Sequence, residues 1–314
     1  MITVLTGGTG GAKFVWGLAQ IVPADQLTVI VNTGDDLTWW GLHVSPDLDS
    51  VMYALSGKLS PERGWGLADE SFRCLDRMKE LGAEGWFQLG DLDLATHIRR
   101  SEMLAQGRPL SGVTRELCRA MGVGVQLLPM SDDSVETRVI TRTGDLAFQE
   151  YFVREHSQPD VLDVKFRHSE RARTAPGVLE AIAKADMIFV APSNPVTSIG
   201  PILSVPGVRD VLKNSTAPVA AVSPIVGGQA VSGPAGKMMR MRKWRVSPAG
   251  IAEAYRDFAH VIIADSKDET ERSAIEEQFV RAAFTNTIMS SADDKIALAR
   301  FALSAVSMGR EAAR

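Results

Sequence analysis

The sequence predicts an α/β protein with a Rossmann-like, doubly wound, mostly parallel six-stranded sheet that carries a helical and antiparallel insertion. Two observations predict this class. Short β-branched runs that end in Gly, Pro, Asn or Asp and lead into helix-period segments recur at both ends of the chain, which is typical of βαβ units. The runs at 28–31 and 187–190 are continuously apolar, as expected of parallel strands that are buried on both faces.

Six strands are expected, at residues 2–6, 27–31, 187–191, 218–222, 260–264 and 283–288. Between residues 65 and 173 the pattern changes to helices, such as 110–121, and then to alternating segments at 134–140 and 147–154, which favour exposed antiparallel strands. We therefore predict a nucleotide-binding core at 1–64 and 174–314 and an inserted region at 65–173 that lies over the active site. A last helix is expected over 292–308, where apolar residues recur at helical spacing.

The composition excludes several classes of protein. The chain has 314 residues, 45% of them hydrophobic, which is enough for a large core. Its net charge of -4 gives no excess of Lys and Arg for a nucleic acid partner. No signal peptide pattern opens the chain, and no apolar stretch approaches the roughly 20 residues of a membrane helix, so a cytoplasmic protein without a membrane partner is expected. Cys74 and Cys118 lack the spacing of a metal or redox pair and are expected to be buried thiols.

A glycine-rich segment, TGGTGGAK, follows the first predicted strand directly and ends at Lys13. Because Gly8, Gly10 and Gly11 have no Cβ atom, their backbone N–H groups can approach an anion, and the positive end of the following helix favours it. The segment is neither a Walker A loop nor a complete dinucleotide motif. We interpret it, with Thr9 and Lys13, as a phosphate-binding loop, and a turn that only allows close packing remains the alternative.

Carboxylates follow the second strand and open the next predicted helix. Asp35 lies in the segment NTGDD, and Asp47 and Asp49 lie in SPDLD. Parallel topology places them at the sheet edge that carries the glycine loop, where carboxylates facing phosphates need a cation such as Mg²⁺. Asp35 and Asp49 are the predicted ligands of this cation. The alternatives are a helix cap for Asp47 and a solvated acid or a base for Asp49. An acid about 20 residues after the glycines often binds the NAD ribose, so an NAD-dependent dehydrogenase stays an alternative.

Two later strands are followed by loops rich in hydroxyl and amide groups and in rigid turns. Ser193, Asn194, Ser198 and Gly200 lie in the first loop, and Ser223 opens the second. Both loops lie at the carboxyl ends of strands, where α/β sheets bind ligands, so a pocket for a nucleotide base and ribose is predicted. A structural Pro/Gly turn is the alternative for either loop.

Trp40 is a candidate for binding a flat ring, and His97 is a candidate catalytic residue. Trp40 follows the acidic turn at Asp35 and can stack on a ring system, with core packing as the alternative. His97 ends the acid-rich segment LGDLDLATH, where a hydrogen-bonded structural histidine is the alternative.

In this order, the segments GGTGGAK, NTGDD, SPDLD, RGWG, LGDLDLATH, LLPMSDD, APSNPVTSIGPI, SPIVGG and SGPAGK resemble the 2-phospho-L-lactate transferase family over residues 1–289. The resemblance implies a homodimeric enzyme of coenzyme F-420 biosynthesis. Such enzymes use Mg²⁺ to join the guanosine diphosphate ester of a small acid, such as lactyl-2-diphospho-5'-guanosine, to the deazaflavin Fo, and release GMP. The related gluconeogenesis-factor family shares the glycine loop, so a non-catalytic nucleotide-binding regulator is the alternative.

The resemblance also assigns roles to residues. It implies that Asp35 holds Mg²⁺ against the diphosphate, that Asp49 holds the same metal or accepts the hydroxyl proton of Fo, and that Lys13 stabilises charge on the phosphates. The implied nucleotide contacts are Gly8, Thr9, Gly10, Gly11, Ser193, Asn194, Ser198, Gly200 and Ser223, and the Fo contacts are Asp49, Gln88, Trp40 and His97. Some relatives carry a basic residue where this chain has Gln88. The acid stays open among phospholactate, phosphoenolpyruvate and 3-phosphoglycerate.

Overall fold

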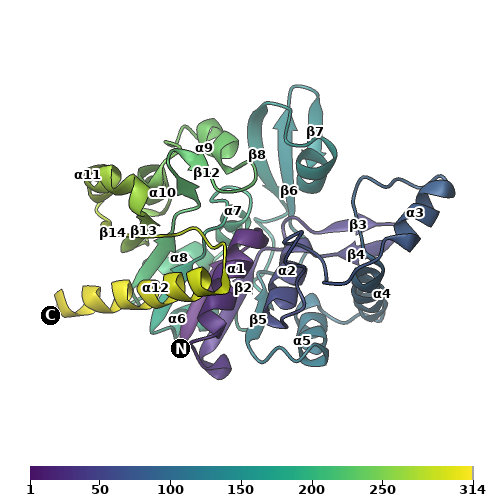
Figure 1. The fold of residues 1–314 in the computed structure, drawn as a ribbon, viewed down its shortest axis with the longest axis horizontal. Helices are drawn as coiled ribbons and strands as arrows, with labels where there is room; N and C mark the ends of the chain where they lie inside the picture. The colour runs from purple at the N-terminus through teal and green to yellow at the C-terminus, as the bar shows by residue number, and fades with distance from the viewer. Residues whose placement is uncertain (313–314) are drawn as a thin grey trace.

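The computed structural model, which describes the backbone of residues 1–312, is built around a seven-stranded parallel sheet with strand order β14-β13-β10-β9-β1-β2-β5 (Figure 1). The predicted α/β class is confirmed. The strands are β1 (Ile2–Thr6), β2 (Leu27–Val31), β5 (Gln126–Pro129), β9 (Met187–Val190), β10 (Val219–Val222), β13 (Val261–Asp265) and β14 (Arg281–Thr285).

All six predicted strands are present, with shifts of one to three residues at some of their ends, but the predicted number of strands was wrong. The seventh strand, β5, comes from the segment assigned to the insertion and pairs with β2, so that Leu127 lies beside Val29. It has four residues and lies at the edge of the sheet. A run this short gives little periodic signal. The division of the chain into a core and an insertion stays a prediction.

Helices cover both faces of the sheet and form two separate cores. Neighbouring residues of β1 show this, because Val4 packs into one core and Leu5 into the other. The first face carries α1 (Gly8–Ala19), α2 (Pro46–Leu55), α5 (Leu110–Ala120) and the predicted last helix, α12 (Ala292–Ala312). The second carries α6 (Val178–Ala183), α7 (Ile199–Ser204), α8 (Val208–Lys213), α10 (Pro248–Tyr255) and α11 (Arg272–Glu276).

The remaining elements lie over the carboxyl ends of the strands and at the periphery. They include the hairpin β3 (Leu37–Trp39) and β4 (Leu42–Val44), the helices α3 (Arg73–Glu80), α4 (Asp91–Ala105) and α9 (Ala235–Met241), the antiparallel sheet of β6 (Glu136–Thr141), β7 (Gly144–Ala147) and β8 (Val161–Arg167), the short pair β11 (Ile225–Val226) and β12 (Gln229–Ala230), and the turns η1 (Ala24–Gln26), η2 (Glu150–Arg154) and η3 (Ser266–Glu271).

The prediction of a strand over residues 147–154 was wrong. β7 ends at Ala147, and residues 150–154 form a π-helical turn. Phe148 and Phe152 stack on each other with ring centroids 5.6 Å apart, and Tyr151 is fully buried. Their i, i+3 and i+4 spacing is helical, and it was mistaken for alternation.

Cys118 is buried on α5 as expected, but Cys74 is exposed on α3, so that expectation was wrong. The reason is that α3 buries a single residue, Leu75. Within residues 1–312, no helix is both long and apolar enough to cross a bilayer.

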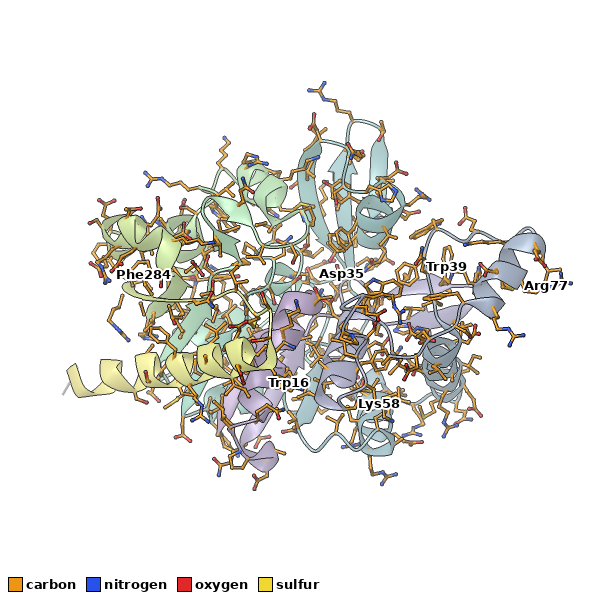
Figure 2. All side chains as sticks on the ribbon, in the orientation of Figure 1. Trp16, Asp35, Trp39, Lys58, Arg77 and Phe284 are labelled. Atoms are coloured by element: carbon orange, nitrogen blue, oxygen red, sulfur yellow. The ribbon has the colours of Figure 1, made fainter. Side chains whose placement is uncertain are left out.

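The order of the strands determines where a ligand can bind. From β1 the chain runs to β2 and β5 on one side and then returns to β9 on the other side of β1. In doubly wound sheets this reversal opens a crevice at the carboxyl ends of the two central strands. Asp35, which follows β2 by four residues, lies near the middle of the molecule (Figure 2).

Candidate active site

A cavity of about 820 Å³ lies at the carboxyl ends of β1, β9 and β10. Its walls are the turn after β1, the loops after β9 and β10, the start of α2 and three segments at 63–66, 86–89 and 148–156. The volume falls in the upper part of the roughly 300–1,000 Å³ range of small-molecule sites. The crevice predicted from the strand order is therefore a real cavity.

The glycine segment forms the start of α1 rather than a loop before it. The helix begins at Gly8, which has a φ of 69°, a value that favours glycine. A Cβ atom at Gly10 would lie 2.8 Å from the carbonyl oxygen of Pro192, in the loop after β9. The N–H groups of the first helical turn have no partner within the helix. The Gly8 N–H donates to the Asp47 carboxylate, whereas Thr9, Gly10 and Lys13 line the cavity and can bind an anion there.

Two predicted hydroxyl groups have structural partners. Ser193 Oγ donates to Gly7 O at 2.7 Å and accepts from Gly7 N–H at 3.2 Å, which fixes the turn before α1 to the loop after β9. Ser223 Oγ bonds both the carbonyl oxygen and the N–H of Ile225 at 3.1 Å. These two serines therefore fix the conformation of the loops that form the cavity wall near the start of α1.

Asn194 and Thr197 leave polar atoms free at the cavity wall. Asn194 Oδ1 accepts from the N–H groups of Val196 and Thr197, at 3.0 and 3.3 Å. Its Nδ2 atom is buried and has no partner, and the same holds for Thr197 Oγ1. Buried polar groups are normally satisfied, so these two atoms indicate a place where a ligand completes the hydrogen bonding.

Two buried carboxylates share one amide group. Asn32 Nδ2 donates to Asp35 Oδ2 at 3.0 Å and to Asp47 Oδ2 at 2.9 Å. Burial raises the pKa of Asp47 to about 6, although Asn32 and the N–H of Gly8 oppose the rise. Burial and the charge of Asp47 raise the pKa of Asp35 well above its ordinary value. The proposed cap role of Asp47 was wrong, because its carboxylate reaches across to Asn32 and Gly8.

Asp49, on the same helix, has a different partner. Arg100 of α4 binds both oxygens of the Asp49 carboxylate, with Nη1 3.0 Å from Oδ2. Asp49, Asp93 and His97 offer ligand atoms within 4.8 Å of one another, and they are the one such group of at least three among the described residues. The Arg100 guanidinium already supplies a positive charge to this cluster.

Aromatic rings form another part of the cavity wall, beside the segments at 231–235 and 287–290. Trp65, Trp86, Phe87, Phe148 and Phe152 line it together with Gln88 and His97. Arg63 lies over the ring of Trp65, with its Cζ 5.5 Å from the centroid. This half of the cavity suits a flat, apolar ring system.

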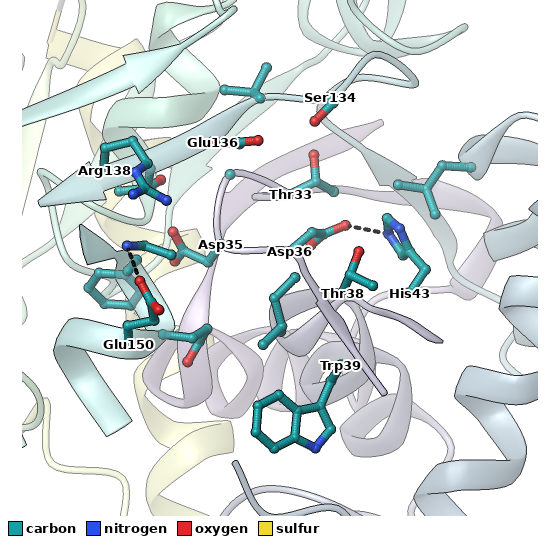
Figure 3. A pocket seen from close by; sticks show the side chains of 18 of the residues that line it. Thr33, Asp35, Asp36, Thr38, Trp39, His43, Ser134, Glu136, Arg138 and Glu150 are labelled. Atoms are coloured by element: carbon teal, nitrogen blue, oxygen red, sulfur yellow. Dashed lines mark hydrogen bonds and ion pairs between the residues drawn. The ribbon is translucent and has the colours of Figure 1, made fainter. Parts of the chain in front are cut away.

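A second cavity of about 710 Å³ lies beside the first and shares Asp35, Trp86, Phe148 and Gln149 with it. Figure 3 shows Asp36 in this cavity, where its Oδ2 accepts from Ser45 Oγ at 2.7 Å and lies 3.0 Å from His43 Nε2. Trp40 lines this cavity rather than the larger one. Its Nε1 donates to the backbone of Glu84 at 3.0 Å.

The structure brings most of the predicted site residues to one cavity, whose lining includes Gly8, Thr9, Gly10, Lys13, Asp35, Asp49, Gln88, His97, Ser193, Asn194, Ser198 and Ser223. Three predicted residues lie outside it. Gly11 packs against Thr6 and Ser193, Gly200 packs against Phe166, and Trp40 lines the second cavity. The sequence interpretation missed the roles of Asn32, Asp47, Tyr53, Asp93 and Arg100. Three of these lie in segments that it had singled out, NTGDD, SPDLD and LGDLDLATH.

Comparison with known proteins agrees with this arrangement. Residues 2–296 match the family model described as 2-phospho-L-lactate transferase CofD. The chain is 45% identical to the 2-phospho-L-lactate transferase of Methanococcoides burtonii, a match that covers 92% of this chain and 94% of that protein. It is also 45% identical to the phosphoenolpyruvate transferase of Kitasatospora aureofaciens, over 96% of each chain.

A solved structure shares the fold. A member of the UPF0052 family from Bacillus halodurans superimposes with a TM-score of 0.62 at 18% identity, covering 91% of this chain and 92% of the other. This likeness supports the architecture alone. The family match and the curated relatives, which span nearly the whole sequence, show that the chain belongs to the 2-phospho-L-lactate transferase CofD family and is a transferase.

Proposed function

We propose that the enzyme transfers a phospho-organic acid, 2-phospholactate or a close analogue such as phosphoenolpyruvate, from its guanosine diphosphate ester to the deazaflavin Fo and releases GMP. This is a step of coenzyme F-420 biosynthesis. The observation that carries the proposal is the composition of the large cavity, in which a helix N-terminus and buried carboxylates face an aromatic wall. A charged diphosphate and a flat ring need these two environments side by side.

The donor half of the site is formed by the start of α1 and the loops after β9 and β10. The first turn of α1 and Lys13 bind the phosphates, because unpaired N–H groups and a cation both stabilise anionic oxygens. The free Nδ2 of Asn194 donates to the nucleotide. Close approach of the phosphates to the backbone explains the run of glycines.

Asp35 and Asp47 fit a divalent cation. Asp35 Oδ1 is buried and has no hydrogen-bond partner, although Thr137 lies near enough to lower the pKa of Asp35. Asn32 holds the carboxylates of Asp35 and Asp47 next to each other, and a positive ion relieves the repulsion between them. Oxygen ligands of this kind suit Mg²⁺, which would neutralise charge on the diphosphate. We assign the second carboxylate to Asp47 rather than to the predicted Asp49, because Arg100 already binds both oxygens of Asp49.

The acceptor half is formed by Asp49 and the aromatic wall. The deazaflavin ring packs against Trp65 and the stacked pair Phe148 and Phe152, while the ribityl chain extends toward Asp49. Each carboxylate oxygen has two lone pairs, so Asp49 can accept a hydrogen bond from the acceptor while Arg100 holds it. Gln88 offers a neutral amide where some relatives have a positive charge.

The reaction is a substitution at phosphorus. The primary ribityl hydroxyl oxygen bonds to the phosphorus next to the organic acid, the bond from this phosphorus to the GMP oxygen breaks in line with it, and the hydroxyl proton leaves through Asp49 or water. Little covalent help from the protein is needed for such a transfer, so positioning and charge neutralisation supply most of the catalysis.

Incubation with Fo and a mixture of guanylated acids tests the proposal. We expect GMP and a phosphodiester of Fo in equal amounts, and the mass of the product identifies the acid. Tight binding of nucleotide without turnover would instead favour a non-catalytic regulator, and hydride transfer to NAD would favour a dehydrogenase. The homodimer and the cytoplasmic location stay predictions, and a monomeric mass in solution scattering would contradict the first.

A further inference from the structure

A cluster of buried polar side chains connects α2 to α4 at the acceptor half of the site, where Asp49, Tyr53, Asp93 and His97 line the cavity and Arg100 lies behind them. Arg100, His97 and Tyr53 are each about 1% exposed, and Asp49 and Asp93 are at most 6% exposed. Ionic groups buried this deeply need complete partners. The sequence interpretation assigned a role to only two of the five, Asp49 and His97.

Arg100 donates to Asp49 on one side and to His97 on the other, while Tyr53 donates to Asp93 at the far end. Arg100 Nη1 donates to Asp49 Oδ2 at 3.0 Å and lies 3.2 Å from His97 Nδ1. A guanidinium can only donate, so His97 Nδ1 accepts and the imidazole proton lies on Nε2. His97 Nε2 lies 3.2 Å from Asp93 Oδ1, an electrostatic contact without the geometry of a hydrogen bond. Asp93 Oδ1 also accepts from Tyr53 Oη at 2.6 Å.

Electrostatic interactions keep Arg100 and Asp93 ionised in spite of their burial. Burial alone would lower the pKa of Arg100, but the Asp49 carboxylate raises it above its ordinary value. Burial likewise would raise the pKa of Asp93, but His97 and Tyr53 hold it below its ordinary value. Burial and the neighbouring Asp49 and Asp93 raise the pKa of Tyr53, which keeps its hydroxyl protonated as a donor.

We propose that Arg100 is a positioning residue that fixes the Asp49 carboxylate toward the acceptor, and that His97, Asp93 and Tyr53 hold Arg100 in place. The inference rests on the proposed function, in which Asp49 contacts the acceptor hydroxyl. A bidentate guanidinium fixes the plane of a carboxylate, whereas an ammonium holds it at one point. Arg100 therefore acts on the acceptor alone, and donor binding at α1 is independent of it.

The variant Arg100→Lys tests the proposal because it keeps the charge and loses the planar contact. We expect the KM for Fo to rise about 10- to 100-fold, the usual effect of disturbing a group that orients a ligating side chain, with GDP affinity unchanged within about twofold. Arg99→Lys is the matched control, because Arg99 is half-exposed on the same helix and pairs with Glu102 and Glu116. It should change neither quantity.

The same experiment separates this inference from the proposed function. Wild-type protein that fails to bind Fo, followed by deazaflavin fluorescence, refutes the proposed function. Wild-type protein that binds and converts Fo, together with an Arg100→Lys variant of unchanged KM for Fo, refutes only the positioning role. Equal losses of GDP and Fo binding in a folded Arg100→Lys variant also refute it, because donor binding is then not independent of Arg100.

Two further variants keep the test decisive. In an Asp49→Asn background, Arg100→Lys should cost nothing more, because the carboxylate that it positions is gone. Additive losses would overturn the proposal. If Arg100→Lys does not fold, Tyr53→Phe decides, since it removes one hydrogen bond at the far end of the cluster and keeps the ring. A KM for Fo raised several-fold at constant GDP affinity supports the proposal, and an unchanged KM overturns it.

Discussion

The side-chain amide of Asn32 donates to both Asp35 and Asp47, at 3.0 and 2.9 Å, and so holds two buried carboxylates beside each other. Such a pair destabilises the protein when nothing positive lies between its members. The pair of Asp35 and Asp47 therefore lowers the stability of the folded protein. We therefore expect the stability of the ligand-free enzyme to depend on pH and on divalent cations.

Substitution of Asp47 should stabilise the ligand-free protein at neutral and higher pH. The folded-state pKa of Asp47 is about 6 against an ordinary value of 3.8, so the folded protein binds more protons than the unfolded chain between these values. The contribution of Asp47 therefore lowers the stability of the wild type as the pH rises through 6, and this contribution is absent from Asp47→Asn. The advantage of the variant should be about 1 kcal/mol larger at pH 8 than at pH 5.

Thermal unfolding without divalent cations at the two pH values measures this advantage. Asp25→Asn, which changes an exposed acid on η1, is the control and should show none. Added Mg²⁺ should raise the Tm of the wild type more than that of Asp47→Asn. An advantage that is the same at both pH values would contradict the role given to burial.

Gly10→Ala should weaken donor binding, because its Cβ would lie 2.8 Å from the carbonyl oxygen of Pro192 and force α1 away from the loop after β9. Gly112→Ala on α5 is the matched control. Its Cβ would meet Pro109 at an ordinary 3.5 Å, so it should stabilise the helix by about 0.5–1 kcal/mol and leave binding unchanged. Calorimetric GDP affinity and thermal unfolding of both variants check this. Equal GDP affinities in the two variants would count against a phosphate site at Gly10.

Guanosine nucleotides should bind more tightly than adenosine nucleotides. The cavity presents the free Nδ2 donor of Asn194, which suits the carbonyl oxygen of guanine but not the amino group of adenine. Calorimetry with GDP and ADP measures the preference, and Asn194→Ala should reduce it. Equal affinity of the wild type for the two nucleotides would refute it.

The sequence predicted the donor half of the site better than the acceptor half. Strands β1 and β2 are short buried runs rich in β-branched residues. The glycines follow β1 directly and Asp35 lies four residues after β2, so parallel topology alone brings them together. Arg100 gave no such signal, because it stands beside Arg99 in a helix and only packing distinguishes the buried arginine from the half-exposed one. Asp47 was missed for a related reason, since a carboxylate in a first helical turn is usually a local stabiliser.

The division of the cavity into a donor half at Asp35 and an acceptor half at Asp49 is tested most directly by the affinity of two variants for GDP in the presence of Mg²⁺. We expect Asp35→Asn to bind GDP more weakly, with partial rescue by excess Mg²⁺, because the variant removes charge that the cation needs. Asp49→Asn should keep nearly wild-type GDP affinity while its kcat falls by roughly 10² to 10⁴, or less if Asp49 only positions the acceptor. Equal losses of GDP affinity in both variants, or none in Asp35→Asn, would contradict the division.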